Sequence, residues 1–377
     1  MKKETLFKFI FIFIILILFG IVFDKLIKER ASIKEGARGM DDDSNAVKEA
    51  KNKKIPGQVK TRNANLLKLR LMDYCIKGSY NTAFSGNYVS KEMVKLVLAR
   101  GVRFIDFQVF YLPPTGAVVQ EGSTSEYGAY VGYTDKKTSF QPDNIKNDKL
   151  PSLGKMLYTV LDNAFVNKMG DEYRVKNPKD PLFVQIRMRT EDSNKPALFE
   201  KIQETLRNYL ATSPYTYGNK TVSRFTKLSQ IKQKLIVVFD SDDYYFVRRN
   251  GFNKSDYVNM LSNSESLKRF YFSEMKTREN KIANIVPPKT LTEDTTDVSD
   301  FKMAVPDNDV SGYQPNPNPF LAIKLYGCQV IMNQYYSADD NLLNMENMFN
   351  ERGLGIIPLS HCLSYINLVA DPEQTKV

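Results

Sequence analysis

The sequence predicts an α/β protein whose strands and helices alternate to form a TIM-type (β/α) barrel. Three segments have the apolar pattern of buried strands, at residues 102–110, 182–190 and 234–240. Helical patterns lie at residues 90–100, 153–164 and 197–210, so that strands and helices alternate along the chain. Such alternation is typical of a parallel sheet, and a barrel is the leading candidate for its architecture.

Composition limits the classes of function. Of the 377 residues 42% are hydrophobic, which supports a sizeable core, and the formal net charge of +10 favours an anionic partner. A membrane surface fits this charge. Nucleic acid is not expected as a partner, since no binding motif accompanies the charge, and nothing identifies a protein partner. His361 is the single histidine, which excludes a mechanism with two imidazoles and a multi-histidine metal site.

The amino-terminal segment predicts a membrane protein. Residues 6–23 are almost wholly apolar, with Lys8 as the one charge, and this length is close to the ~20 residues that cross a bilayer. No small-x-small cleavage site follows, so we expect an uncleaved single-pass transmembrane anchor at residues 1–25. Basic residues flank both ends, and the orientation is therefore undetermined. Residues 26–62 are charged and predict a stalk.

The remaining chain divides into two halves of one barrel. Residues 63–245 hold the first set of strand and helix patterns. Residues 246–300 are polar and contain Pro287-Pro288, which predicts an insertion or linker. Residues 301–370 resume strand-like segments and are expected to complete the barrel.

Polar side chains interrupt the faces of two predicted strands. Asp106 and Gln108 share a face with Phe104 and Phe110, because strand side chains alternate. An acid and an amide on a buried apolar face are either a satisfied structural pair or part of a site. In the strand at 182–190, Arg187 and Arg189 fall on one face and the apolar residues on the other.

Several segments, in order, resemble the catalytic barrel of phosphoinositide-specific phospholipase C, a PLC-like phosphodiesterase. The strand at 100–110 resembles the family's Arg-Gly-Cys-Arg-x-Val-Glu-Leu-Asp-x-Trp, and Ser-Tyr-Asn-Thr at 79–82 resembles Ser-His-Asn-Thr. Residues 118–124 resemble Val-x-Tyr-His-Gly-x-Thr. Further similar segments are 181–187, 228–237, 318–319, 327–330, 347–350 and 353–358.

The resemblance implies a catalytic site that this chain does not keep. The family's two histidines correspond to Tyr80 and Glu121, and tyrosine, with a reference pKa near ~10, is a poor base at neutral pH. The family's calcium ligands Asn, Glu, Asp and Glu correspond, in this order, to Asn81, Asp106, Gln108 and Arg187. The last of these positions therefore holds a cation in place of a carboxylate. A guanidinium beside Asp106 would fill the calcium site, so no cofactor is expected, and calcium only if the altered site still binds it.

Two hypotheses about function follow from this comparison. In the first, the chain is a membrane-anchored pseudoenzyme that serves as a binding or scaffolding module. Arg187 and Arg189 would then attract the head group of an anionic lipid or a phosphoinositide. In the second, it is a divergent, metal-independent phosphoric diester hydrolase acting on inositide lipids, with Asp106 and Glu121 as acid and base and Arg187 as the clamp on phosphate. Whether the chain is an enzyme stays open at this point.

Overall fold

The computed structural model describes residues 68–113, 127–136, 138–143, 145–166, 177–251, 257–276, 299–307, 314–352 and 355–369, with single positions at 45, 48, 173 and 175. The predicted anchor at 1–25 and nearly all of the predicted stalk at 26–62 lie outside these residues. Within the described part of the chain, no helix is both long enough and apolar enough to cross a membrane.

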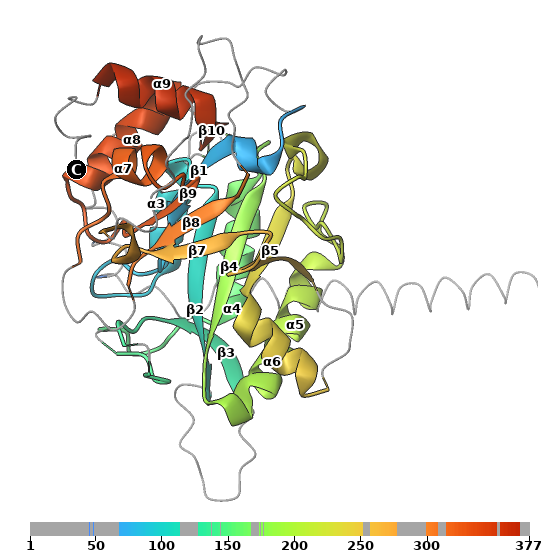
Figure 1. Cartoon of the computed structure of the whole chain (residues 1–377). Coiled ribbons are helices and arrows are strands. Elements are labelled where there is room, and N and C mark those ends of the chain that lie inside the picture. The colour runs from blue at the N-terminus through green and yellow to red at the C-terminus, as the bar shows by residue number, and fades with distance from the viewer. Residues whose placement is uncertain are drawn as a thin grey trace, which may run out of the picture. The chain divides into compact units, whose positions relative to one another are not determined.

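Eight of the described strands form a nearly closed parallel barrel (Figure 1), which confirms the predicted fold class. Neighbours in the barrel follow the order β6-β5-β4-β2-β1-β9-β8-β7, and every pairing in this order is parallel. Their bounds are β1 Tyr74–Ser79, β2 Phe104–Leu112, β4 Leu182–Arg189, β5 Leu235–Asp240, β6 Val258–Ser262, β7 Lys268–Tyr271, β8 Lys302–Val305 and β9 Val330–Asn333.

Two further strands run antiparallel to the barrel. The strand β3 (Gly128–Gly132) pairs with β2, and β10 (Ile356–Pro358) pairs with β1. The helices are α3 Lys91–Ala99, α4 Leu153–Ala164, α5 Lys195–Leu210, α6 Ser241–Arg249, α7 Pro319–Lys324, α8 Asp340–Arg352 and α9 Leu359–Val369. Short 3-10 turns occur at Leu71–Asp73, Asp192–Asn194, Leu228–Ile231 and Glu274–Lys276.

The alternation along the strands divides the core into an inner and an outer layer. Phe104 and Phe183 pack inside the barrel, with their ring centroids 5.5 Å apart. Val184 and Ile186 lie in the outer cluster, which also contains buried residues of α3, α4 and α5. The faces predicted for β4 are therefore confirmed, because its apolar side packs under the helices and leaves Arg187 on the inner side.

The structure differs from the prediction of an insertion at 246–300. The strands β6 and β7 lie within that range and belong to the barrel sheet. They are only five and four residues long, and β7 begins with two basic residues, Lys268 and Arg269. A short polar strand at the end of the strand order lacks the apolar run on which the prediction depended. Residues 277–298 lie outside the described part of the chain.

A buried ion pair joins α8 to the barrel. The Lys77 Nζ atom lies 2.8 Å from Glu346 Oε2 and donates a second hydrogen bond to the Arg100 carbonyl at 2.7 Å. The Tyr335 hydroxyl donates to the other oxygen of Glu346. Burial lowers the pKa of Lys77, and the Glu346 carboxylate opposes that shift. The two charges thus stabilise each other, together with the hydrogen bonds that each of them makes.

We expect Glu346→Gln to destabilise the protein by about 3–5 kcal/mol, because it leaves the Lys77 ammonium buried without a counter-ion. Chemical denaturation, followed by circular dichroism, measures this loss. Glu351→Gln, at an exposed position of the same helix, is the matched control and should change the free energy of unfolding by less than about 0.5 kcal/mol. Equal effects of the two substitutions would contradict the assignment.

Candidate functional site

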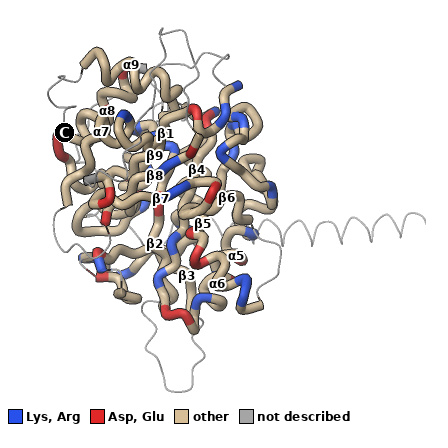
Figure 2. The backbone as a smooth tube through the Cα atoms, viewed as in Figure 1, with Lys and Arg blue, Asp and Glu red and all other residues tan. Residues whose placement is uncertain are grey.

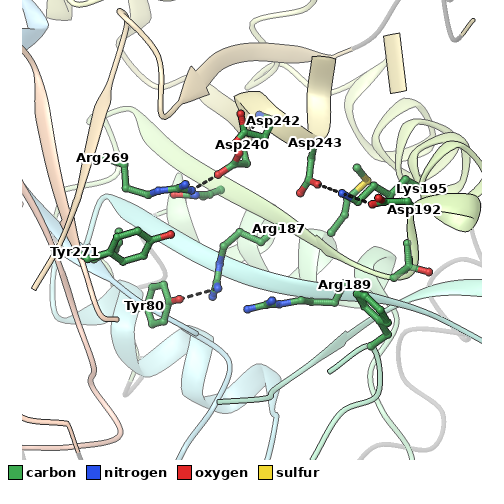
Figure 3. A pocket seen from close by; sticks show the side chains of 15 residues that line it. Tyr80, Arg187, Arg189, Asp192, Lys195, Asp240, Asp242, Asp243, Arg269 and Tyr271 are labelled. Atoms are coloured by element: carbon green, nitrogen blue, oxygen red, sulfur yellow. Dashed lines mark hydrogen bonds and ion pairs between the residues drawn. The ribbon is translucent and has the colours of Figure 1, made fainter. Parts of the chain in front are cut away.

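A cavity of about 310 Å³ lies at the carboxyl ends of the barrel strands (Figure 3). Its walls are side chains that follow or end β1, β4, β5 and β7, together with the beginnings of α5 and α6. The carboxyl ends of parallel strands are where barrel proteins place their functional groups. Two of the predicted site residues, Arg187 and Arg189, line this cavity, and Tyr80 borders it.

Arg187 forms a bidentate ion pair with Asp106 across the strands β4 and β2. Its Nε lies 2.7 Å from Asp106 Oδ1, and its Nη2 lies 2.6 Å from Asp106 Oδ2. In the parallel pairing of β2 with β4, Asp106 lies opposite Gln185, and Gln108 lies opposite Arg187. The Asp106 side chain is 0% exposed and that of Arg187 is 11% exposed, so the pair that the sequence predicts is present and buried.

The loop after β1 completes the surroundings of Arg187. Its Nη1 donates to the Tyr80 hydroxyl at 2.7 Å, and its Nη2 donates to Asn81 Oδ1 at 2.6 Å. Four of the five guanidinium N–H donors are therefore used within the protein. Asn81 has a positive φ of 46°, and this turn lets its backbone N–H donate to Asp106 Oδ2 at 2.9 Å.

Two side chains of this cluster have shifted pKa values. Burial lowers the pKa of Arg187, but the Asp106 carboxylate and Tyr80 outweigh it, and the net pKa is raised above the usual range. Burial likewise raises the pKa of Tyr80, although the positive charge of Arg187 opposes this shift. Tyr80 therefore stays a neutral phenol at neutral pH and is not suited to act as a base.

The residues at the calcium positions do not fit a calcium ion. The Asn81 and Asp106 oxygens already accept hydrogen bonds from the Arg187 guanidinium, whose positive charge would repel a cation. The amide of Gln108 is bound at both ends to the backbone of Thr134, each hydrogen bond being 3.0 Å long. Within the described residues, no group of three or more His, Cys, Asp or Glu side chains is arranged to hold a metal.

Of the two positions that correspond to the family's histidines, Tyr80 is the one among the described residues, and it lines the cavity. Glu121 lies outside the described residues, which stop at 113 and resume at 127. His361 lies on α9, which follows β10, and β10 pairs with the beginning of β1. Tyr80 follows the other end of β1, and six residues of strand span roughly 20 Å. The one imidazole of the chain is therefore at the opposite end of this strand.

A set of charged residues that the sequence analysis did not select completes the cavity. Asp240 at the end of β5 forms an ion pair with Arg269 of β7. Lys195 lies 2.8 Å from Asp243 and 3.0 Å from Asp192. Acidic and basic residues consequently lie side by side around these strand ends (Figure 2). The run Asp240-Ser241-Asp242-Asp243, directly after a predicted strand, was the available signal.

We expect Arg187→Met to cost about 3–5 kcal/mol of stability, since Asp106 would remain buried as an unpaired carboxylate. A double-mutant cycle tests this with Arg187→Met, Asp106→Asn and the double variant, which removes both charges. Denaturation of these three variants should give a favourable coupling energy of about 0.5–3 kcal/mol. Additive losses would show that the two side chains do not depend on each other.

Comparisons with known proteins give a likeness of fold. No family model matches the chain, and no curated protein matches it in sequence. Among solved structures, PLC21 of L. pealei has a TM-score of 0.48 at 13% identity, and the match covers 78% of this chain. The chain spans only 37% of the length of that protein.

Two bacterial enzymes are also similar. The calcium-dependent phosphoinositol-specific phospholipase C of a Pseudomonas species has a TM-score of 0.43 at 9% identity, with 78% of this chain and 97% of that chain covered. The phosphatidylinositol-specific phospholipase C of Listeria monocytogenes has a TM-score of 0.32 at 14% identity, with 55% and 68% covered. All of these identities are below 25%, so the likeness is one of fold alone.

Proposed function

We propose that this chain is a membrane-anchored, phospholipase C-like barrel that has lost calcium-dependent hydrolysis and binds a phosphate-bearing group at a membrane. The observation that carries the proposal is the Arg187 guanidinium bound to Asp106, Asn81 and Tyr80. A metal ion could replace this side chain only if four hydrogen bonds were broken and a buried ion pair were separated, and the free-energy cost of that is high. The sequence resemblance and the parallel barrel support the phospholipase C-like part of the proposal.

The lack of an imidazole in the described lining of the cavity also supports a binding role. Proton transfer near neutral pH is most efficient for a group whose pKa lies near 7. Tyr80 is neutral, because its pKa is raised by burial, and the single histidine of the chain is at the other end of β1. Among the described residues that line the cavity there is therefore no imidazole, and the Tyr80 phenol is neutral at neutral pH.

Features suited to binding are retained. The cavity of about 310 Å³ is at the lower end of the range for small-molecule sites, and Arg187, Arg189 and Lys195 contribute positive charge to its lining. The net charge of +10 favours approach to an anionic surface. Residues 1–25 would anchor the barrel in the bilayer, so that the cavity needs to contact only the head group.

Purified full-length protein should not hydrolyse phosphatidylinositol in mixed micelles, with or without millimolar calcium. A ligand that binds only the folded state raises the midpoint of thermal unfolding. Because we expect no calcium to bind, calcium should leave this midpoint unchanged. Magnesium at equal ionic strength is the control for unspecific effects of a divalent cation. Calcium-stimulated turnover would overturn the proposal.

A permanently charged Arg187 next to an open cavity favours a second candidate, a metal-independent phosphodiesterase with this guanidinium as the phosphate clamp. If the chain has diesterase activity of this kind, Glu121→Gln and Arg187→Ala should each abolish it. Glu126→Gln, in the same segment of the sequence, is the matched control. Activity that survives both of the first two substitutions would contradict this mechanism.

A further inference from the structure

Two arginines lie on one side of the cavity, and the other side carries aspartates that outnumber the two cations paired with them, Lys195 and Arg269. Arg187 and Arg189 extend from β4, and Figure 3 shows Asp240, Asp242 and Asp243 across the cavity from them. The described lining contains four cations and four carboxylates, so its formal charges balance: Arg187, Arg189, Lys195 and Arg269 against Asp192, Asp240, Asp242 and Asp243. A purely anionic ligand would meet the repulsion of these aspartates.

Two of the carboxylates retain acceptor capacity. Asp242 is exposed, and its one side-chain contact among the described residues is a 3.3 Å hydrogen bond from Asn263. Asp243 uses Oδ1 for its ion pair with Lys195 at 2.8 Å. A carboxylate has about four lone-pair positions, so neither group is saturated by these contacts. Both lie at the start of α6, beside the cavity.

A buried amide of β4 adds a third acceptor to the lining of the cavity. Gln185 is 2% exposed and lines the cavity, and its Nε2 donates to Ser262 Oγ. Ser262 donates its own hydroxyl hydrogen to the Phe239 carbonyl, so it must accept from Gln185. This fixes the amide orientation and leaves Gln185 Oε1 without a donor among the described residues. A buried acceptor of this kind calls for a ligand that donates a hydrogen bond.

The opposite side of the cavity is suited to phosphate. Burial lowers the pKa of Arg189, and the nearby charge of Arg187 lowers it further. An anion between the two guanidinium groups would offset this repulsion and favour both charged forms. Arginine is also the side chain best matched to the geometry of phosphate oxygens.

We propose that the cavity binds the zwitterionic head group of a phosphate ester that carries a primary ammonium. The phosphate lies toward Arg187 and Arg189, and the ammonium lies toward Asp242, Asp243 and Gln185 Oε1. This inference rests on the proposed binding function and specifies its ligand. The ligand chemistry is shared by a lipid of the ethanolamine type and by its soluble, deacylated ester.

The structure favours a primary ammonium over a quaternary one. A quaternary ammonium has no N–H to offer to the three acceptors, and it is usually bound by the faces of aromatic rings. Arg187 covers the Tyr80 ring at 4.2 Å from its centroid, and Arg269 lies 5.4 Å from the centroid of Tyr271. One face of each of these rings is thus already occupied by a protein cation.

The test measures binding to the full-length protein in detergent by calorimetry, with glycerophosphoethanolamine, glycerophosphocholine and inositol 1-phosphate as probes. We expect glycerophosphoethanolamine to bind at least about tenfold more tightly than the other two. Asp242→Asn should remove most of this preference. Asp148→Asn, at an exposed position outside the lining, is its control. Arg189→Gln should weaken all three probes, with Arg207→Gln as the control.

Vesicles distinguish the two sources of the ligand. Greater binding to phosphatidylcholine vesicles that contain phosphatidylethanolamine than to pure phosphatidylcholine vesicles supports a lipid head group. Binding of the soluble probe alone supports a soluble ester of the same chemistry. Tighter binding of inositol 1-phosphate, or stronger binding after Asp242→Asn, overturns this inference and leaves the proposed binding function intact. Failure of all three probes and of the vesicles to bind overturns both.

Discussion

The ion pair between Asp106 and Arg187 is the interaction on which the mouth of the barrel depends. A carboxylate that is 0% exposed needs a counter-ion, and the guanidinium supplies it with two short hydrogen bonds. The same guanidinium then binds Tyr80 and Asn81, so the loop after β1 is held by it as well. The left-handed turn at Asn81, with φ of 46°, is stabilised by the hydrogen bond to Asp106.

This arrangement decides which chemistry the barrel can support. A divalent cation and a buried arginine cannot share one carboxylate and one amide oxygen without strong repulsion. Burial keeps the phenol of Tyr80 neutral, and Arg187 covers one face of its ring, so this residue of the loop after β1 makes a structural contact and does not act as a base. What remains open is the space between β4 and α6, where the charges are arranged for contact with a ligand.

The sequence resemblance predicted the Asp106–Arg187 pair, because it placed both residues at calcium-ligand positions, and the period of two along their apolar strands determined the face of each. It did not predict β7, because four residues beginning Lys268-Arg269 do not resemble a buried strand. Nor could spacing reveal the contact between Asp240 and Arg269. These residues are 29 positions apart, and their strands, β5 and β7, come together only in the folded barrel. Cys75, Cys328 and Cys362, scattered in the sequence, likewise share one core layer.

Recognition and approach are separate tasks in this chain. A lining with equal numbers of positive and negative groups exerts little net attraction at a distance, because its fields cancel beyond about a Debye length. Selectivity then comes at contact, from the match between each group of the ligand and one side of the cavity. The excess of basic residues over the whole sequence, +10, supplies the long-range attraction to an anionic surface. A balanced cavity in a basic protein can therefore select a neutral, zwitterionic head group at a membrane whose charge comes from other lipids.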